Sequence, residues 1–225
     1  HQKIKLISLA RDSYVFIPEY GFFSKLAYSY TWGGAAMAVK NLNYNYYLNV
    51  SDYIAVDFDQ LAEIIDRIGG VTVNIDEDEA RYLSNYPNVH VGACLLDGET
   101  AVSYARIRKS SATDSDRKRT GRQREVILSI LNTLQTMPLS QYPGFVRDCL
   151  GMCATSFEAE TLLTMAAETL GQNYTVEQYF FPEGQVEWWG GLIKEYFYYV
   201  YDLRRASDRI YRIIYEELYI SGYDD

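Results

Sequence analysis

The chain is poor in the residues that build the common nucleophilic and metal sites. Its 225 residues include only two histidines, His1 and His90, which argues against a Ser-His-Asp triad and against a His-rich metal site. Three cysteines are present, Cys94, Cys149 and Cys153. This small, odd number fits neither a disulfide scaffold nor a Cys-rich zinc site, so we expect buried free thiols, and a pairing of Cys149 with Cys153 near a helix end stays open.

Long hydrophobic runs are also missing. The sequence contains no signal peptide and no apolar run of about 18 residues or more. Hydrophobic residues nevertheless make up 48% of the chain, which suffices for a sizeable core and argues against disorder. Because residues 3–9 already read as a core strand, we expect that this domain lacks its first strands.

Positive charge is concentrated in one segment of an otherwise acidic chain. The formal net charge is -9, which argues against a nucleic-acid partner, since such domains usually carry a basic face. From Arg106 to Arg124, however, eight Lys or Arg accompany only two Asp, so this segment carries 8 - 2 = +6 and the remainder -9 - 6 = -15. This pattern predicts a focused anion site.

The hydrophobic pattern predicts one α/β domain over residues 1–225, with a central mixed sheet flanked by helices on both faces. The expected strands cover residues 3–10, 14–17, 53–58, 71–75 and 179–181. The expected helices cover about 34–43, 59–68, 97–106, 116–135, 139–150, 158–170 and 203–218. Segments 19–32 and 76–93 read as irregular.

Two features of this pattern predict specific local structure. Residues 53–75 read as strand, helix and strand, which favours parallel pairing of the two strands, with Asp59 as the helix cap. Gly69 and Gly70 are expected to stop that helix. For Gly33 and Gly34 a tight turn into a helix is favoured over a phosphate cradle.

The strongest group of candidate functional residues follows the predicted helix 97–106. Arg106 and Arg108 stand at its end, and Arg119, Arg122 and Gln123 stand near the start of the next helix. Spacings of three and four place the latter on one helical surface, where free N–H groups and the helix dipole favour an anion. Because arginine grips phosphate oxygens in a fork, several converging arginines suit a pyrophosphate. The alternative is a solvated charged helix face.

Two further segments add candidates. Arg11 and Asp12 follow a strand that we expect to be central, where ligands usually bind in open α/β sheets, so Arg11 is expected to meet the other arginines across a cleft. The alternative is a turn with a local ion pair. Trp188 and Trp189 suit either a sugar-stacking platform or, more commonly, hydrophobic packing.

Five segments resemble motifs of the LytR-CpsA-Psr family, in the family's order. They are residues 6–13 (LISLARDS), 24–35 (SKLAYSYTWGGA), 53–58 with 68–71 (YIAVDF and IGGV), 96–108 (LDGETAVSYARIR) and 116–123 (DRKRTGRQ). The similarity covers about residues 3–135, is most specific in the last two segments, and leaves helices 139–220 to complete the domain.

The resemblance implies a phosphotransferase that moves a polyprenyl-pyrophosphate-linked glycopolymer, such as teichoic acid or capsular or wall polysaccharide, onto peptidoglycan. By motif, the implied catalytic residues are Arg11, Arg106, Asp116 and Arg119. The implied substrate-binding residues are Arg108, Arg122, Gln123, Lys25 and Asp12. The alternatives are a non-catalytic polyprenyl-pyrophosphate-binding module and a pyrophosphatase that uses the same arginines.

The resemblance also implies a cofactor and a location. Members of the family use Mg²⁺, and place two metal-binding aspartates upstream of the segment that here contains Arg11. They are anchored at the extracellular face of the bacterial cytoplasmic membrane, within the cell wall. We expect both the aspartates and the anchor to lie outside this chain. Hydrophobic faces at 61–68 and 127–134 suit either a lipid tunnel or ordinary core packing.

Overall fold

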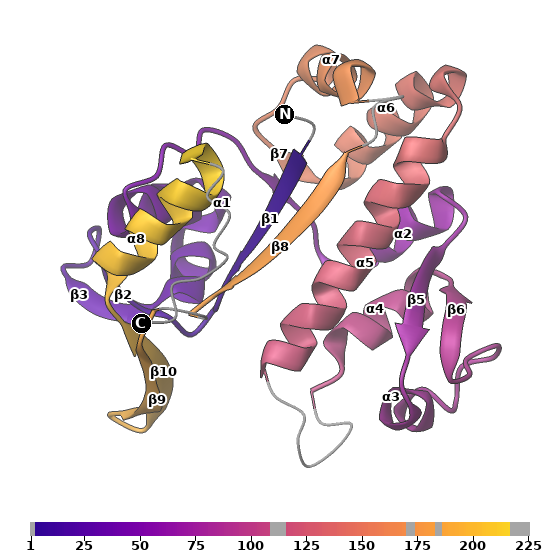
Figure 1. Cartoon of the computed structure of the whole chain (residues 1–225). Coiled ribbons are helices and arrows are strands. Elements are labelled where there is room, and N and C mark those ends of the chain that lie inside the picture. The colour runs from indigo at the N-terminus through magenta and orange to yellow at the C-terminus, as the bar shows by residue number, and fades with distance from the viewer. Residues whose placement is uncertain (1–2, 109–115, 170–173, 183–185, 217–225) are drawn as a thin grey trace. The chain divides into compact units, whose positions relative to one another are not determined.

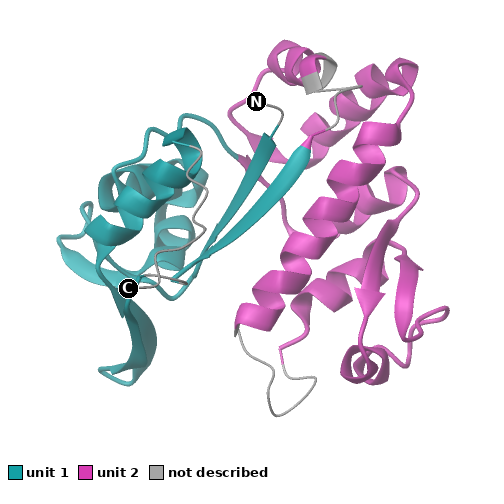
Figure 2. Cartoon of the chain, viewed as in Figure 1, with its two compact units in different colours: residues 1, 3–53, 175–225 teal, residues 2, 54–174 magenta. Residues whose placement is uncertain are grey.

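The structure, a computed structural model, describes residues 3–108, 116–169, 174–182 and 186–216. The chain forms two compact units, shown in Figure 2. Unit 1 comprises Lys3–Tyr53 and Thr175–Asp225, and unit 2 comprises Ile54–Tyr174. Each unit combines helices with strands, which confirms the α/β class. The single domain expected over 1–225 stays a prediction.

Unit 1 is built around a parallel pair of strands that are distant in sequence. β1 (Lys3–Leu9) runs beside β8 (Thr175–Phe181), with Leu9 opposite Phe181 (Figure 1). The other elements are β2 (Tyr14–Ile17), β3 (Phe22–Lys25), α1 (Leu26–Tyr46), β9 (Trp188–Ile193), β10 (Tyr196–Tyr201), α8 (Leu203–Tyr211) and the π-helical turn η2 (Arg212–Glu216). β2 with β3, and β9 with β10, form antiparallel hairpins. Their core contains Val15, Ile17 and Phe181.

Unit 2 packs helices around short antiparallel strand pairs. Its elements are β4 (Ile54–Ala55), α2 (Phe58–Arg67), β5 (Val71–Ile75), α3 (Glu77–Tyr82), β6 (Gly92–Leu96), α4 (Gly98–Arg106), α5 (Asp116–Thr136), the 3₁₀ turn η1 (Leu139–Gln141), α6 (Tyr142–Met152), β7 (Ala154–Thr155) and α7 (Ala159–Thr169). β5 alternates buried and exposed residues, so one of its faces joins a core with Ile65, Leu96 and Tyr104.

Strand directions are mixed, as expected, but the pairing differs from the prediction. The described strands form five two-stranded ladders, of which only β1–β8 is parallel. Parallel pairing of 53–58 with 71–75 was wrong, because β4 pairs with β7 and β5 with β6, both antiparallel. Asp57 explains the short β4. Its side chain accepts the Gln60 N–H at 2.8 Å, and the Gln60 side chain accepts the Asp57 N–H, so this capping box starts α2 before Asp59.

Three segments contain more regular structure than the sequence suggested. Residues 76–93 include α3, which starts at a second capping box between Asp76 and Glu79, and the start of β6. Residues 19–32 include β3 and the start of α1, so Gly34 (φ 67°) kinks α1 instead of opening it. The hairpin of β9 and β10 was not predicted, and β8 starts earlier than residue 179. The stop at Gly69 and Gly70 is confirmed by φ values of 85° and 99°.

Candidate functional site

The end of α4 presents two arginines to solvent. α4 starts at Asp97, whose carboxylate accepts the Thr100 N–H at 2.9 Å, and the hydrogen bonds from Thr100 lower the pKa of Asp97. Its opposite end carries Arg106 and, two residues later, Arg108, both exposed. The guanidinium carbon of Arg106 lies 4.4 Å from the ring centroid of Phe58, a cation–π contact. Phe58 therefore limits the positions that the Arg106 side chain adopts.

A chain of hydrogen bonds that starts at buried Tyr104 fixes α4 next to these arginines. The Tyr104 hydroxyl donates to Glu125 Oε2 at 2.6 Å, and the other oxygen of Glu125 accepts the Asn74 N–H at 2.7 Å. Burial, together with Glu125, raises the pKa of Tyr104 well above its ordinary value, so its hydroxyl remains a donor. The chain joins α4 to α5 and β5, and thereby holds the helix end that carries Arg106.

Arg122, expected to bind substrate, lies inside unit 2. Its side chain is only 3% exposed, and its Nε lies 2.6 Å from Glu79 Oε1. Its Nη1 donates to the carbonyl oxygen of Ile107 at 3.0 Å. Ile107 separates Arg106 from Arg108 in the chain. Arg122 thus contacts the backbone between the two exposed arginines, and its expected role in substrate binding stays a prediction.

The first turns of α5 carry the remaining candidates of unit 2. Arg119 is partly buried and Gln123 is exposed. Lys118 Nζ lies 4.0 Å from Asp76 Oδ2, the residue that caps α3. Asp116 is the first residue of α5, and its side chain lies outside the described residues, as do residues 109–115. The chain thus places several cations near a helix start, where free N–H groups favour anions.

In unit 1, Arg11 lies on a turn that the backbone holds from two sides. The Ala27 N–H donates to the carbonyl oxygen of Arg11 at 3.0 Å, and the Tyr199 N–H donates to that of Asp12 at 2.9 Å. The Arg11 side chain is half exposed, and its Nε is 3.8 Å from Asp12 Oδ1. Lys25 Nζ lies 2.8 Å from the same oxygen. Asp12 and Lys25 thus largely neutralise each other, while among the described residues Arg11 forms a long ion pair with Asp12.

Buried hydroxyl groups also fix the turn that carries Arg11. Buried Ser13 exchanges a 2.8 Å hydrogen bond with the Tyr201 hydroxyl, which lies 2.5 Å from the Tyr46 hydroxyl. Ser13 also donates to the carbonyl oxygen of Ala10 at 2.7 Å. Burial raises the pKa of Tyr46 well above its ordinary value, so both tyrosines stay neutral donors and acceptors. The turn that presents Arg11 is therefore anchored to α1 and β10.

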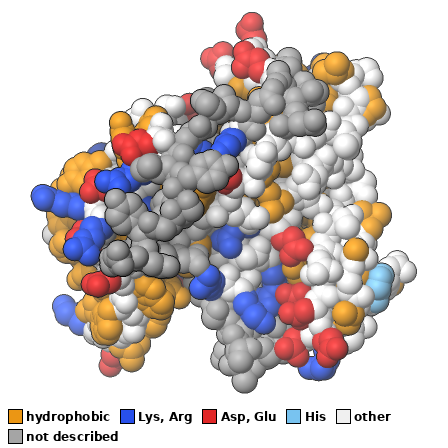
Figure 3. Space-filling model, viewed as in Figure 1, with side chains coloured by type: hydrophobic (Ala, Val, Ile, Leu, Met, Phe, Trp, Pro, Cys, Tyr) orange, Lys and Arg blue, Asp and Glu red, His pale blue; other side chains and the backbone are white. Residues whose placement is uncertain are grey.

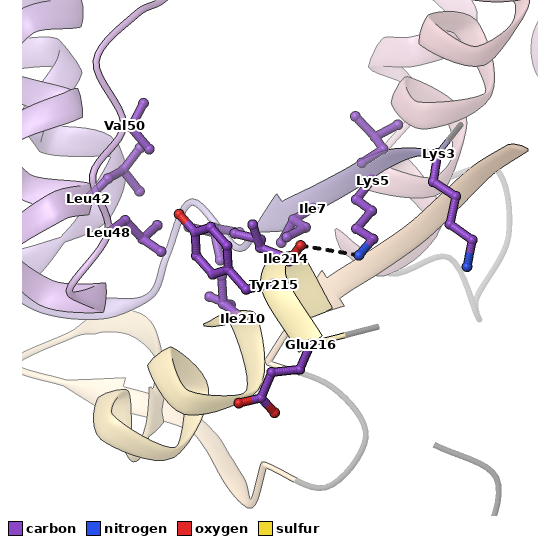
Figure 4. A pocket seen from close by; sticks show the side chains of 12 residues that line it. Lys3, Lys5, Ile7, Leu42, Leu48, Val50, Ile210, Ile214, Tyr215 and Glu216 are labelled. Carbon is purple, nitrogen blue, oxygen red and sulfur yellow. Dashed lines mark hydrogen bonds between the residues drawn. The ribbon is translucent and has the colours of Figure 1, made fainter. Parts of the chain in front are cut away.

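Unit 1 also contains a partly open cavity of about 930 Å³ beside β1 (Figure 4). Its wall is mainly aliphatic, and its lining residues are Lys3, Lys5, Leu6, Ile7, Leu9, Leu42, Leu48, Val50, Ile210, Ile214, Tyr215 and Glu216. Lys5 Nζ donates to the carbonyl oxygen of Ile214 at 3.3 Å, which closes part of the rim. β1 therefore lines an apolar space with Leu9 and presents a cation with Arg11, two residues further on.

Comparison with known proteins decides the family. The LytR_cpsA_psr family model matches residues 1–212, which is most of the chain. The chain belongs to the LytR-CpsA-Psr family. This confirms the family resemblance seen in the sequence motifs.

Curated relatives and solved structures are consistent with this family. The TagU teichoic acid transferase of Oceanobacillus iheyensis is 29% identical over 205 residues, which are 88% of this chain and 61% of the relative. That of Enterococcus faecalis is 33% identical over 132 residues, 59% of this chain and 42% of the relative. The chain thus spans less than two thirds of these relatives. The structure of TagT with bound octaprenyl pyrophosphate lipid matches with TM-score 0.73 and 17% identity, covering 94% of this chain and 78% of that one, and shares the fold.

For a LytR-CpsA-Psr protein, magnesium is the expected cofactor. In the part of the chain that the structure describes, no three His, Cys, Asp or Glu side chains come together to hold a metal ion. The described residues therefore do not supply a magnesium cage, and Mg²⁺ stays a prediction of the family resemblance. None of the described helices is both long and apolar enough to cross a bilayer.

Sequence reasoning missed the residues that support the LytR-CpsA-Psr site. Phe58, Glu79 and Glu125 contact the arginines or their helix, and Tyr201 holds the Arg11 turn. The capping-box spacing from Asp76 to Glu79 was a readable signal, since it predicts α3. No local pattern predicts the contacts of Phe58, Glu125 and Tyr201, because their partners are distant in sequence. The hydrophobic face 61–68 packs in the core of unit 2, the plainer of its two interpretations.

Proposed function

We propose that this chain belongs to a phosphotransferase that moves a polyprenyl-pyrophosphate-linked glycopolymer onto peptidoglycan. The observation that carries the proposal is the family match over residues 1–212, together with the exposed arginines at the matching motifs. Its support includes the curated relatives, which are named polyisoprenyl-teichoic acid–peptidoglycan teichoic acid transferases, and the TagT structure that contains a polyprenyl pyrophosphate. The glycopolymer we expect is teichoic acid or another wall or capsular polysaccharide.

The chemistry suits exposed arginines that are already held in place. A hydroxyl of peptidoglycan attacks the phosphorus that bears the glycan, so a new O–P bond forms as the bond to the lipid phosphate breaks. Polyprenyl phosphate leaves with that electron pair, and the hydroxyl proton passes to the surrounding water. Negative charge grows on the phosphoryl oxygens, and guanidinium groups fixed beforehand stabilise it without reorganisation. In unit 2 we assign this role to the exposed Arg106 and Arg108 and, by its motif position, to the partly buried Arg119. In unit 1 we assign it to Arg11 by its motif position.

Contacts with neighbouring residues hold these arginines, or the segments that carry them, in position. Arg106 rests on Phe58, and Arg122 with Glu79 holds the peptide segment between Arg106 and Arg108. In unit 1 the Ser13–Tyr201 bond fixes the Arg11 turn. Such pre-positioning keeps the cations where charge develops, which is the usual way in which phosphoryl transfer is catalysed.

The cavity of unit 1 suits the prenyl part of the same molecule. It is lined mainly by aliphatic side chains, and β1 connects it to the Arg11 turn. Burial of isoprene units there is favourable by about 25 cal/mol per Å² of apolar surface removed from water. Replacing Leu42 by Trp should fill the cavity and weaken binding of farnesyl diphosphate, while leaving binding of inorganic pyrophosphate unchanged. Equal affinity for farnesyl diphosphate in the variant would remove the cavity from the proposal.

A transfer assay tests the function directly. The chain is incubated with a lipid-linked glycopolymer, Mg²⁺ and peptidoglycan sacculi, and the sacculi are washed with detergent. Transfer leaves glycopolymer covalently bound to the sacculi and releases polyprenyl phosphate. A pyrophosphatase releases soluble glycopolymer phosphate instead, and a binding module leaves the lipid-linked substrate intact. Either of the last two outcomes contradicts the proposal.

The proposal includes a place of action. The acceptor is peptidoglycan and the donor is carried by a membrane lipid, so the reaction belongs at the outer face of the cytoplasmic membrane. We expect the native protein to be anchored there. Fractionation of cells that express the native gene checks this expectation, and recovery of the protein in the cytoplasm contradicts it.

A further inference from the structure

The β9–β10 hairpin exposes aromatic rings on both of its faces. Trp188 and Trp189 are 53% and 54% exposed, so neither packs in the core as the plainer sequence interpretation held. Figure 3 shows hydrophobic side chains gathered over this hairpin. Because neighbouring residues of a strand point to opposite faces, Trp188 and Trp189 lie on different faces. Exposed aromatic patches of this kind usually mark interaction surfaces.

The face with Trp188 carries connected rings. Opposite residues in the register are Trp188 with Tyr201, Gly190 with Tyr199, and Leu192 with Phe197. The Tyr199 ring centroid is 5.4 Å from that of Trp188 and 5.1 Å from that of Phe197, both in edge-to-face geometry. The exposed rings of Trp188 and Phe197 therefore flank the ring of Tyr199, which is half-buried and packs on the core of unit 1. We call these three rings the Trp188 face.

Two glycines let the rings lie close to the backbone. A Cβ atom at Gly190 would meet Phe197 Cζ at 3.1 Å and Trp188 Cζ3 at 3.2 Å. A Cβ atom at Gly191 would meet Trp189 Cζ2 at 2.4 Å. Each indole therefore covers a glycine of its own face instead of standing away from the hairpin. About half of each indole remains exposed and is available to a flat partner such as a sugar ring.

The Trp188 face is continuous with the Arg11 turn inside unit 1. The N–H of Tyr199 donates to the carbonyl oxygen of Asp12 at 2.9 Å, and Ser13 forms a β-bridge with Tyr199. The ring that touches both Trp188 and Phe197 thus belongs to the residue bonded to the turn with Arg11. A phosphate at Arg11 would therefore lie on the turn whose backbone is bonded to the strand of this face.

The hairpin suits a saccharide better than a bilayer. Its turn consists of Lys194 and Glu195, both exposed, and insertion of the tip into lipid would take both charges out of water. Indoles that lie along the strands also reach little beyond them. A pyranose ring, by contrast, has C–H groups with partial positive charge that stack on the negative π face of an aromatic ring.

We propose that the Trp188 face binds the first sugar rings of the lipid-linked glycopolymer, while its phosphates lie at Arg11. This inference rests on the proposed function and adds the subsite for the transferred glycan. The donor sugar is favoured over the acceptor because it is covalently joined to the phosphate. Stacking on this face raises the affinity for a donor that carries sugars above that for the bare prenyl diphosphate.

Two ligands and two matched variants test the proposal. We compare farnesyl diphosphate with farnesyl diphosphate that bears an N-acetylhexosamine disaccharide, using calorimetry on the full chain. The disaccharide should strengthen binding to the wild type about tenfold, the size expected for one aromatic contact. Trp188→Ala should abolish this gain, whereas Trp189→Ala, equally exposed on the other face, should retain it. All three proteins should bind bare farnesyl diphosphate equally.

Other outcomes each have a definite meaning. Absence of binding of bare farnesyl diphosphate to the wild type overturns the proposed function itself. If the wild type binds bare farnesyl diphosphate but gains no affinity from the disaccharide, only the sugar subsite is overturned. The same holds if Trp188→Ala and Trp189→Ala lose the disaccharide gain equally. Trp188-dependent binding of free chitotetraose at the same affinity as the linked sugar shows an acceptor site instead. Trp188-dependent co-sedimentation with phosphatidylglycerol vesicles shows a membrane contact instead.

A third variant guards against effects on folding. Gly190→Ala removes no aromatic ring. It displaces the rings of Trp188 and Phe197, because the added Cβ would lie within 3.2 Å of both. It should reduce the disaccharide gain with an unchanged far-UV spectrum and melting temperature within a few degrees of the wild type. A full disaccharide gain in a folded Gly190→Ala protein contradicts the proposal.

Discussion

Arg122 and Glu79 form a buried ion pair, with Arg122 Nε 2.6 Å from Glu79 Oε1 and both side chains at most 8% exposed. Arg122 belongs to α5 and Glu79 to α3, so the pair joins two helices of unit 2. The same guanidinium donates to the Ile107 carbonyl oxygen, between Arg106 and Arg108. A residue that the family motif suggested for substrate binding thus also contacts the backbone between two exposed arginines.

Removal of one member of this pair should destabilise the protein strongly. Glu79→Ala leaves a buried guanidinium without its carboxylate and removes the α3 capping box, so the free energy of unfolding should fall by about 3–5 kcal/mol. Urea denaturation measures this change. Arg81→Ala is the matched control, because Arg81 is largely exposed and pairs with Asp78 at the surface, and it should cost under about 1 kcal/mol. Similar losses in both variants would contradict the account.

The hydroxyl network under the Arg11 turn predicts a second effect. Tyr201→Phe keeps the ring but leaves the hydroxyls of buried Ser13 and Tyr46 without their shared partner. The free energy of unfolding should fall by about 1–3 kcal/mol, the cost of unsatisfied buried polar groups. Affinity for pyrophosphate should also fall, because the turn loses an anchor. A stability equal to that of the wild type would show that the network contributes nothing.

The tyrosines also predict how stability depends on pH. Burial raises the pKa of Tyr46 and Tyr104 in the folded chain above the value of about 10 in the unfolded chain. Below that pH both states keep the proton, so these groups cause no change. Above it the unfolded chain loses protons first, and the free energy of unfolding falls by up to about 1.4 kcal/mol per pH unit for each tyrosine. Tyr104→Phe should show a shallower decline between pH 10 and 11 in urea titrations, and an unchanged slope would contradict this.

Lys25 offers a test of direct against indirect action. Its Nζ lies 2.8 Å from Asp12 Oδ1, so it neutralises a carboxylate beside Arg11. Lys25→Met should weaken pyrophosphate binding, because the freed Asp12 carboxylate then repels the ligand. If Lys25 acts only in this way, the double variant Lys25→Met with Asp12→Asn should bind as well as the wild type in calorimetry. A double variant as weak as Lys25→Met shows that Lys25 itself contacts phosphate.

Local signals in the sequence were sufficient for the helices and for the family, but not for the pairing of strands. The apolar spacing at 61–68 and the Gly69–Gly70 stop identify α2 well, because both are local. The partner of β1 lies more than 160 residues away, in β8, and no local pattern encodes it. α3 was missed because an acidic first turn resembles a loop, although acidic residues there favour a helix.

The candidate site shows the same division. The motifs identified Arg106 as a catalytic and Arg108 as a substrate-binding candidate, and both side chains are exposed in the structure. The net charge of the segment could not distinguish these two residues from Arg122, because the sequence alone does not show which arginine is buried. Only the tertiary contact with Glu79 distinguishes them. Arginines that look alike in the sequence therefore differ in exposure: Arg106 and Arg108 are exposed, whereas Arg122 is buried.

The central claim is that Arg106 binds the diphosphate of a prenyl-linked donor, and calorimetry with farnesyl diphosphate tests it most directly. Arg106→Ala should weaken binding by roughly 1–3 kcal/mol, the value of a charge-assisted hydrogen bond, with the free energy of unfolding little changed. Arg81→Ala, a surface arginine of the same unit, should bind as the wild type does. Equal affinities of wild type, Arg106→Ala and Arg81→Ala would contradict the account.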